Sequence, residues 1–200
     1  ISNVKLSIFS SFIALYKLGD SMAGSLSMVF YSDMGFTKYQ IAGISKGIGL
    51  AATLFGAFLG GFVVKCLTKY NALWVCGILQ VLSNFVFILL VKTDATLSML
   101  TMCICVENIA GGMGTTAFVA YISQLCNLKF TATQYALLSS ISGVGRMIFA
   151  SSAGFIVDHV GWAWFYADTA FIGIPGLCIL FWLQQLDKKD TAHTEHIIQQ

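Results

Sequence analysis

The chain has 200 residues, of which 57% are hydrophobic and only 10% are charged, and its formal net charge is +2. Ordinary soluble domains carry about 25% charged residues and disordered chains are polar, so the composition excludes both classes. A net charge this small provides no basic face for nucleic acid. We therefore expect an integral membrane protein that lies in the lipid bilayer and has no nucleic-acid partner.

Six apolar runs follow one another along the chain, separated by short polar joints. A helix needs about 20 mostly apolar residues to cross a bilayer, and the runs do not alternate as barrel strands do. The sequence therefore predicts an all-α membrane bundle at residues 1–185 and a cytoplasmic polar tail at 186–200. The expected spans are 6–31, 40–64, 71–91, 97–125, 134–157 and 162–183.

The lysines of the short joints indicate how the bundle is oriented. Cytoplasmic loops of membrane proteins carry an excess of Lys and Arg. With the N-terminus inside, six lysines lie on the cytoplasmic side and two on the other. The six are Lys5, Lys65, Lys69, Lys129, Lys188 and Lys189, and the two are Lys38 and Lys92. We expect both termini to be cytoplasmic.

An internal repeat relates the two halves of the chain. Segment 36–63 aligns without gaps on segment 130–157, and 9 of the 28 positions are identical, including the opening pattern F-T-x-x-Q-x-A-x-x-S. The second and fifth spans cross the membrane in opposite directions, so the repeat is inverted. Three helices at about 6–91 followed by three at about 97–183 form the 3+3 plan of one half of a major-facilitator transporter.

Ionisable residues lie deep inside several of these spans. Lys17 and Asp20 fall near the middle of the first, and Glu107 and Arg146 near the middles of the fourth and fifth. Each charge at the centre of a span costs about 2.5–3.5 kcal/mol if it faces lipid. We therefore expect these groups, with Lys46 of the second span, to face a common water-filled cavity. The alternative is that they form structural ion pairs that fix helix packing.

Uncharged polar residues accompany the charges. Gln80 and Asn84 are four residues apart and share one face of the third span, which suits hydrogen bonds between helices. Asn108 adjoins Glu107 in the fourth span. We assign all three uncharged residues to the cavity.

Glycines and one proline are expected to shape the helix contacts. Small residues let membrane helices approach closely, and a proline inside a helix kinks it. The glycine candidates are Gly111, Gly112 and Gly114, with the small-xxx-small pairs Gly43/Gly47 and Gly56/Gly60. Pro175, the one proline, falls in the middle of the sixth span.

Enzyme and metal chemistry lack the residues they need. No predicted span contains a histidine: His159 lies in a joint and His193 and His196 lie in the tail. An intramembrane serine protease would need a base beside its serine, and haem or metal sites need buried ligands. The six cysteines show no zinc-type spacing. We expect no enzymatic activity, no cofactor and no metal.

Several strings resemble the AmpG-type muropeptide permeases of the major facilitator superfamily. They are LYKLGD at 15–20, K46 ahead of GL at 49–50, GILQ at 77–80 with SN at 83–84, EN at 107–108 before GGMGT at 111–115, AFVA at 117–120, LCN at 125–127, TATQYALLS at 131–139 and GR at 145–146. The resemblance covers nearly the whole chain up to the tail. It corresponds to the C-terminal half of such a permease.

The resemblance implies a proton-driven importer of N-acetylglucosaminyl-anhydro-N-acetylmuramyl peptides. Such a protein lies in the inner membrane of a Gram-negative bacterium and serves peptidoglycan recycling, and members of the family feed the signal that induces beta-lactamase. The implied partners are the muropeptide, protons and an N-terminal six-helix half in the same or a separate chain. Two alternatives are a facilitator of another anionic cargo such as acetyl-CoA, and a half that does not transport.

On this reading the deep polar groups have separate roles. We expect the cations Lys17, Lys46 and Arg146 to meet the carboxylates of the substrate. We expect Asp20 or Glu107 to take part in proton coupling or to balance those cations.

Overall fold

The computed structural model describes residues 16, 18–93, 95–125, 140, 143–144, 147, 151 and 153–198. Every element of these described residues is helical, which confirms the predicted all-α class. The elements are α2 (Leu18–Asp33), α3 (Lys38–Ile44), the π-helical turn η1 (Ser45–Gly49), α4 (Leu50–Cys66), α5 (Lys69–Lys92), α6 (Leu97–Leu125) and α8 (Trp162–Ile198).

Four of the six predicted spans coincide with long apolar helices. Those helices cover Lys38–Cys66, Lys69–Lys92, Leu97–Gln124 and Trp162–Leu186, and each is long and apolar enough to cross a membrane. The chain is therefore a multi-pass membrane protein. The first predicted span is described only at residue 16 and from residue 18 onward, and most of the fifth lies outside the described residues. The count of six spans and the 3+3 repeat stay predictions.

The chain turns from α2 into α3 through a short, well-defined joint. Gly35 has φ of +90°, a backbone conformation that residues with a Cβ rarely adopt. Thr37 then caps α3: its hydroxyl accepts a hydrogen bond from the Gln40 backbone N–H, and the Gln40 side chain accepts one from the Thr37 N–H at 2.9 Å. This reciprocal pair is a capping box. The Thr and Gln of the repeated F-T-x-x-Q pattern therefore begin a helix in the first copy.

The helix α8 is longer than the predicted sixth span. It continues through Pro175 as one helix and reaches Ile198. The polar tail predicted at 186–200 is thus helical over most of its length. A kink at Pro175 stays a prediction.

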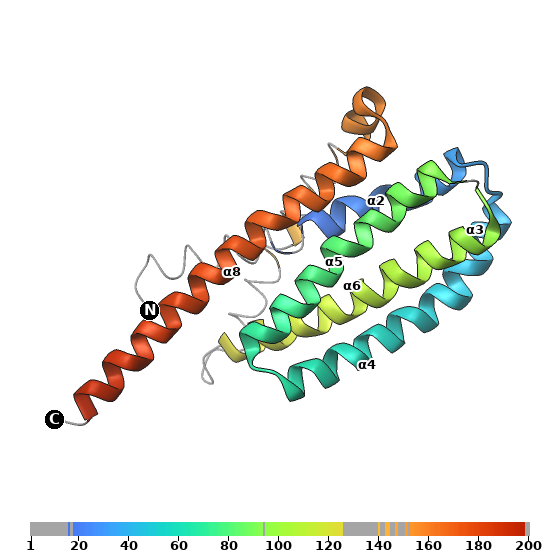
Figure 1. The fold of residues 1–200 in the computed structure, drawn as a ribbon. Helices are drawn as coiled ribbons and strands as arrows, with labels where there is room; N and C mark the ends of the chain where they lie inside the picture. Colours follow the sequence, from blue (N-terminus) through green and yellow to red (C-terminus); the bar gives the residue numbers. More distant parts are fainter. Residues whose placement is uncertain are drawn as a thin grey trace.

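The helices lie side by side in a tilted bundle with α6 between α4 and α5, while α8 runs along α5 and α2 (Figure 1). Two groups of buried apolar side chains hold the bundle together. One contains Phe30, Tyr31, Phe87, Phe165 and Tyr166, and the other contains Tyr16, Leu73, Tyr121 and Leu180. The helices are thus fixed against one another on both sides of the depth at which Asp20 and Glu107 lie.

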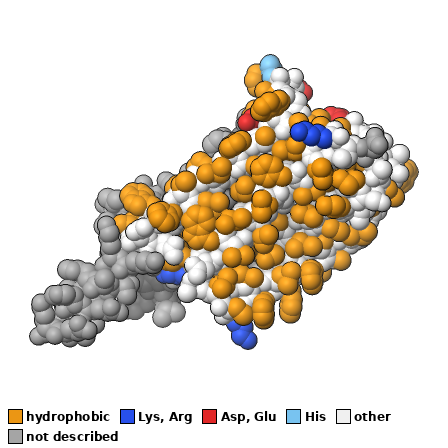
Figure 2. Space-filling view, viewed as in Figure 1, with side chains coloured by type: hydrophobic (Ala, Val, Ile, Leu, Met, Phe, Trp, Pro, Cys, Tyr) orange, Lys and Arg blue, Asp and Glu red, His pale blue; other side chains and the backbone are white. Residues whose placement is uncertain are grey.

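The outer face of the bundle is apolar. Figure 2 shows hydrophobic side chains spread over the described part of one face, while the charged side chains that are visible lie near its edges. On α4, Leu54, Phe58 and Phe62 are all more than half exposed. Such a large apolar surface suits contact with lipid rather than water.

Close approach of α4 to α6 depends on glycines. A Cβ added to Gly60 would lie 2.8 Å from the Met113 backbone, and one added to Gly56 would contact the Ile109 carbonyl oxygen. The predicted small-residue contact is therefore present at this pair. At Gly43 and Gly47 no heavy atom of the described part of the chain lies within 4 Å of an added Cβ.

Alanine at Gly56 should destabilise the bundle, whereas alanine at Gly61 should not. Both changes remove the same backbone freedom, worth about 0.5–1 kcal/mol in a helix, but only the Gly56 methyl group meets the backbone of α6. We expect Gly56→Ala to lower the midpoint of thermal unfolding in detergent by about 2–10 °C. The matched control Gly61→Ala should leave the midpoint unchanged or raise it. Equal shifts for the two variants would contradict this account of the α4–α6 contact.

Candidate functional site

A polar cavity of about 280 Å³ opens between α2, α4 and α6. We call it the Glu107 cavity. Its lining residues are Asp20, Gly24, Thr53, Ala57, Glu107, Asn108, Gly111, Gly112, Thr115 and Thr116. Gly24 and Thr115 are exposed, so the cavity reaches the surface of the described bundle. Two of the deep carboxylates predicted from the sequence therefore share one cavity with Asn108.

Glu107 is held from the neighbouring helix α2. The Tyr31 hydroxyl donates a hydrogen bond to Glu107 Oε2 at 3.2 Å. Gly24, also on α2, lies opposite the other carboxylate oxygen, and a Cβ added there would lie 3.6 Å from Oε1. A hydrogen bond to a carboxylate is stronger than one between neutral groups. The position of Glu107 thus depends on how α2 packs against α6.

An aromatic cluster fixes Tyr31 in place. The Phe87 ring lies between two tyrosine rings, with its centroid 6.2 Å from that of Tyr31 and 4.2 Å from that of Tyr166. Phe30 meets Tyr166 edge-on at 5.0 Å. At the rim, Trp162 Nε1 donates to Asp33 Oδ2 at 3.2 Å and ties the start of α8 to the end of α2. The hydroxyl that reaches Glu107 is therefore positioned by α5 and α8.

Uncharged groups complete the wall between α4 and α6. Asn108 Nδ2 donates to the Ile104 carbonyl at 2.7 Å. Asn108 Oδ1 lies 2.8 Å from Thr53 Oγ1, which also lies 2.9 Å from the Gly49 carbonyl oxygen. The Thr53 hydroxyl has one proton, so it can donate to only one of these two acceptors at a time. When the Thr53 hydroxyl donates to the Gly49 carbonyl, Asn108 Oδ1 can accept a hydrogen bond from another donor in the cavity.

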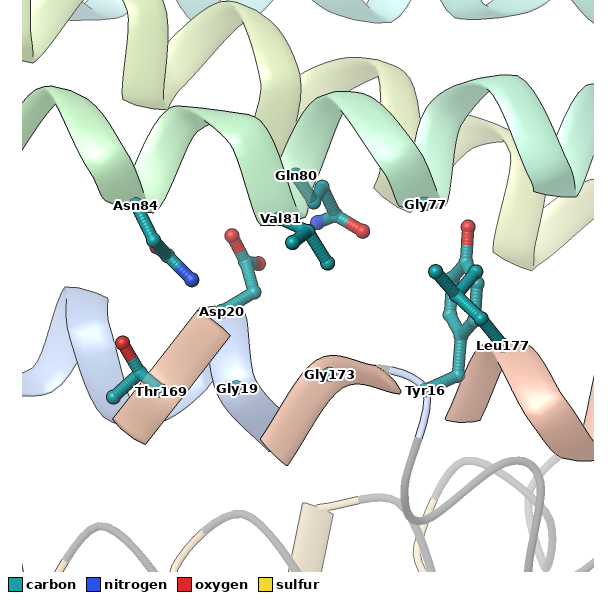
Figure 3. A pocket seen from close by; sticks show the side chains of 10 residues that line it. All are labelled: Tyr16, Gly19, Asp20, Gly77, Gln80, Val81, Asn84, Thr169, Gly173 and Leu177. Atoms are coloured by element: carbon teal, nitrogen blue, oxygen red, sulfur yellow. The ribbon is translucent and has the colours of Figure 1, made fainter. Parts of the chain in front are cut away.

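Gln80 and Asn84 lie in a different place from Asn108. They are buried between α5, α2 and α8, beside a space of only about 10 Å³ that Asp20 also borders. Figure 3 shows the side chains of Asp20, Gln80 and Asn84 pointing into this space. Asp20 thus borders both the Glu107 cavity and this second, much smaller pocket.

Lys46 borders a different hollow from Glu107 in the described part of the chain, and the prediction that the charges share one cavity stays a prediction. It is exposed on the π-helical turn η1 and borders a separate groove of about 540 Å³. We call this the Lys46 groove, lined by Met28, Val29, Ser32, Asp33, Lys38, Ile41, Ala42 and Lys46. The physical reason is depth: Lys46 lies about two turns from Thr53, toward the end of the bundle where α2 meets α3.

The remaining predicted residues have the following positions. Lys17 and Arg146 lie outside the described residues. Gly111 lines the Glu107 cavity and has open space beside it, whereas a Cβ added to Gly112 would lie 2.9 Å from the Ala57 backbone N. Gly114 lies against the Gln80 side chain. Pro175 borders a further pocket of about 310 Å³ beside α8.

Tyr31 and the cavity threonines Thr53, Thr115 and Thr116 were missed in the sequence. Tyr31 looks like one more apolar aromatic residue, and Thr53 and Thr116 look like ordinary helix threonines that bond their own backbone. Thr116 Oγ1 does bond the Gly112 carbonyl at 3.0 Å, but it also lies 3.3 Å from the Ala57 carbonyl of α4. No pattern in the sequence separates these residues from the other aromatic residues and threonines of the spans.

Metal ligands do not gather at this site. Across the described ranges, no group of three or more His, Cys, Asp or Glu side chains is close enough to hold an ion. The chemistry available there is hydrogen bonding and charge: two carboxylates, one amide and several hydroxyls.

The chain is similar to known permeases over most of its length. It is 42% identical over 174 residues to the anhydromuropeptide permease of Escherichia coli K12, which covers 86% of this chain and 35% of that protein. It is 42% identical over 171 residues to AmpG 4 of Rickettsia conorii (86% of this chain, 41% of that protein) and 38% identical over 169 residues to AmpG 1 of Rickettsia prowazekii (84% and 38%). No family model matches the chain.

These relationships confirm the resemblance to the AmpG-type permeases that the sequence motifs indicated. The chain spans about two fifths of the length of the curated relatives it matches. A permease is a transporter and not an enzyme, in agreement with the prediction that the chain has no enzymatic activity.

The contact between Thr53 and Asn108 can be tested by a double-mutant cycle. Thr53→Val and Asn108→Ala should each destabilise the bundle, and the double variant should lose less than the sum because both changes remove one shared hydrogen bond. The coupling in thermal or denaturant unfolding should be about 0.6 kcal/mol and at most about 1.7 kcal/mol, as for other hydrogen bonds between membrane helices. Thr101→Val, whose hydroxyl bonds only its own helix at Leu97, should be additive with Thr53→Val. Additivity of the Thr53 and Asn108 changes would exclude the contact.

Proposed function

We propose that this chain forms the C-terminal six-helix half of a proton-coupled importer of anhydromuropeptides in a bacterial inner membrane. The relationship to AmpG-type permeases supports the cargo class. The observation that carries the proposal is the Glu107 cavity, because its two carboxylates, amide and hydroxyls lie among helices that are otherwise apolar. Ionisable groups at this depth cost several kcal/mol when they face lipid, and inside membrane proteins they commonly mark a substrate or ion pathway.

The chemistry of the cavity suits a cargo that is part sugar and part peptide. Asn108, Thr115 and Thr116 offer both hydrogen-bond donors and acceptors, which match the hydroxyl and amide groups of such a molecule. Gly111 leaves open space beside the wall, so a ring can approach the backbone.

The cations are proposed to hold the carboxylates of the peptide. Lys46 borders the larger groove next to the Glu107 cavity, and we propose that Lys17 and Arg146 act with it. Ion pairs and charge-assisted hydrogen bonds to a carboxylate are the strongest contacts these side chains make. A cargo with sugars at one end and carboxylates at the other would then occupy the cavity and the groove together.

Proton coupling follows from placing two carboxylates in one cavity. Asp20 and Glu107 both repel an anionic cargo when they are ionised. A proton on either group removes one negative charge and weakens that repulsion, so proton and cargo favour each other's binding. The Tyr31 hydroxyl can hydrogen-bond to Glu107 in both protonation states because a hydroxyl is both donor and acceptor.

Transport by this mechanism needs a second bundle. Alternating access in this fold arises when one six-helix half rocks against the other around a central site. We therefore propose an N-terminal half, in the same or a separate chain, as the partner that closes the open side of the Glu107 cavity. Both termini of the present chain would face the cytoplasm, with the tail at 186–200 extending there.

A chimera tests the assignment of cargo. The segment of the Escherichia coli permease that aligns with this chain is replaced by this chain, and the chimera is produced in cells that lack the native permease. We expect uptake of labelled anhydromuropeptide well above that of cells without any permease, and competition by unlabelled anhydromuropeptide but not by acetyl-CoA in vesicles. A chimera that reaches the membrane in normal amount but takes up no muropeptide would contradict the proposed cargo.

Charge neutralisation in the same chimera tests the roles of the residues. Lys46→Met should reduce uptake at least about tenfold, because it removes a charged contact to the cargo worth about 1.5–3 kcal/mol. Glu107→Gln and Asp20→Asn should reduce proton-driven uptake to a similar extent, because neither amide can take up and release the coupling proton. Lys92→Met is the matched control: it removes an exposed lysine at the end of α5, away from both cavities. Uptake should survive in this control, and membrane insertion should be normal in all four. Full uptake in all three site variants would overturn the assignment.

A further inference from the structure

We infer that a single water molecule binds in a buried pocket between α2, α5 and α8, where it links Asp20 to Gln80. We call this the Gln80 pocket. Its lining residues are Tyr16, Gly19, Asp20, Gly77, Gln80, Val81, Asn84, Thr169, Gly173 and Leu177. In Figure 3 the Asp20 carboxylate from α2 and the Gln80 and Asn84 amides from α5 all point into the space between the three helices.

The first argument is a buried donor without a partner. Gln80 is 5% exposed, and its Nε2 atom makes no hydrogen bond to any described residue. Leaving a buried amide N–H unpaired costs about 1–3 kcal/mol. Nε2 carries two protons and therefore needs an acceptor within reach.

The second argument is the size of the space. The pocket measures about 10 Å³, close to the minimum that holds one water molecule, and a buried water also needs two to four polar partners. The Gln80, Asp20 and Asn84 side chains can supply them: the water accepts from Gln80 Nε2 and donates to the Asp20 carboxylate. No sugar or peptide group fits there.

The third argument is that the walls cannot close to bring the protein groups together. A Cβ added to Gly19 would contact the Thr169 carbonyl oxygen, and one added to Gly77 would lie 2.7 Å from Leu177. Behind Gln80, Gly114 of α6 leaves no room even for a methyl group. At Gly19 the backbones of α2 and α8 are already in contact, and at Gly77 and Gly114 side chains fill the space beside the helix. A small molecule in the pocket is therefore the simplest way to satisfy the Gln80 amide.

A sodium ion is the rival occupant of similar size, and the donor pattern disfavours it. Hard cations bind oxygen atoms, whereas the unpartnered atom of Gln80 is an N–H donor, which requires an acceptor such as a water oxygen. Water is therefore the occupant that the side chains favour.

The bound water would have a consequence for Asp20. This carboxylate borders both the Gln80 pocket and the Glu107 cavity. The water gives it a hydrogen-bond donor on the side away from the cavity, and so ties α2 to α5 whatever occupies the cavity. The inference does not require that the chain transports anything.

The direct test is an experimental density map of the purified full chain, sharp enough to show ordered water. We expect one peak within about 2.7–3.2 Å of Gln80 Nε2, with a second polar contact to Asp20 or Asn84. A map that shows these side chains clearly but no peak, or one in which Gln80 Nε2 bonds a protein atom directly, would overturn the inference.

Thermal unfolding of variants gives an independent test. Gln80→Met keeps the length of the side chain but removes the donor, and it should lower the unfolding midpoint by about 2–4 °C. The control is Ser83→Ala at a neighbouring buried position, where the hydroxyl bonds only the Gln80 carbonyl of its own helix. In an Asp20→Ala background, which removes the acceptor, the Gln80→Met shift should fall by at least half, while the Ser83→Ala shift should be unchanged.

Additive shifts for Gln80→Met and Asp20→Ala would overturn the shared water. Replacing sodium with choline in the buffer tests whether the pocket binds a sodium ion instead of water. The midpoint of the unaltered chain should not change with this exchange, and a midpoint that rises with sodium and loses this rise in Gln80→Met would assign the pocket to the cation instead.

Discussion

The hydrogen bond between Tyr31 and Glu107 is the contact on which the arrangement of the site depends. A carboxylate in the middle of a long apolar helix must turn away from lipid, and on α6 it turns toward α2, where the Tyr31 hydroxyl and Gly24 receive it. The Tyr31 ring is held in turn by Phe87 and Tyr166, from α5 and α8. Four helices therefore cooperate to present one acidic group to the Glu107 cavity, and the depth of that cavity follows from the depth of Glu107.

Two glycine contacts give the cavity its other wall. Gly56 and Gly60 bring α4 against the backbone of α6, so Thr53 can reach Asn108 and the polar groups of the two helices face the same space. Larger residues would separate α4 from α6 and break the hydrogen bonds across them. The helices are thus tightly packed at these glycines, and the open space beside Gly111 lies next to this contact.

Much of the fold could be predicted because span length and hydrophobicity are local properties. The predicted span at 97–125 matches α6 residue for residue, and the presence of Glu107 in the middle of an apolar run was sufficient to expect a cavity. Which groups share that cavity could not be predicted, because it depends on helix rotation and packing. Lys46 lies on a π-helical turn and borders another groove, and the role of Tyr31 requires its neighbours on α5 and α8. The Thr37–Gln40 capping box shows that part of the repeated motif encodes a helix start.

The central claim is that the Glu107 cavity holds water while the outer face of α4 meets lipid, and cysteine accessibility tests it most directly. In the chimeric permease with its native cysteines removed, a single cysteine replaces Thr115 in the cavity or Phe58 on the outer face, where the side chain is 74% exposed. A membrane-impermeant, water-soluble thiol reagent should modify Thr115→Cys readily and leave Phe58→Cys unmodified. Rapid modification of Phe58→Cys with an inert Thr115→Cys would contradict the account.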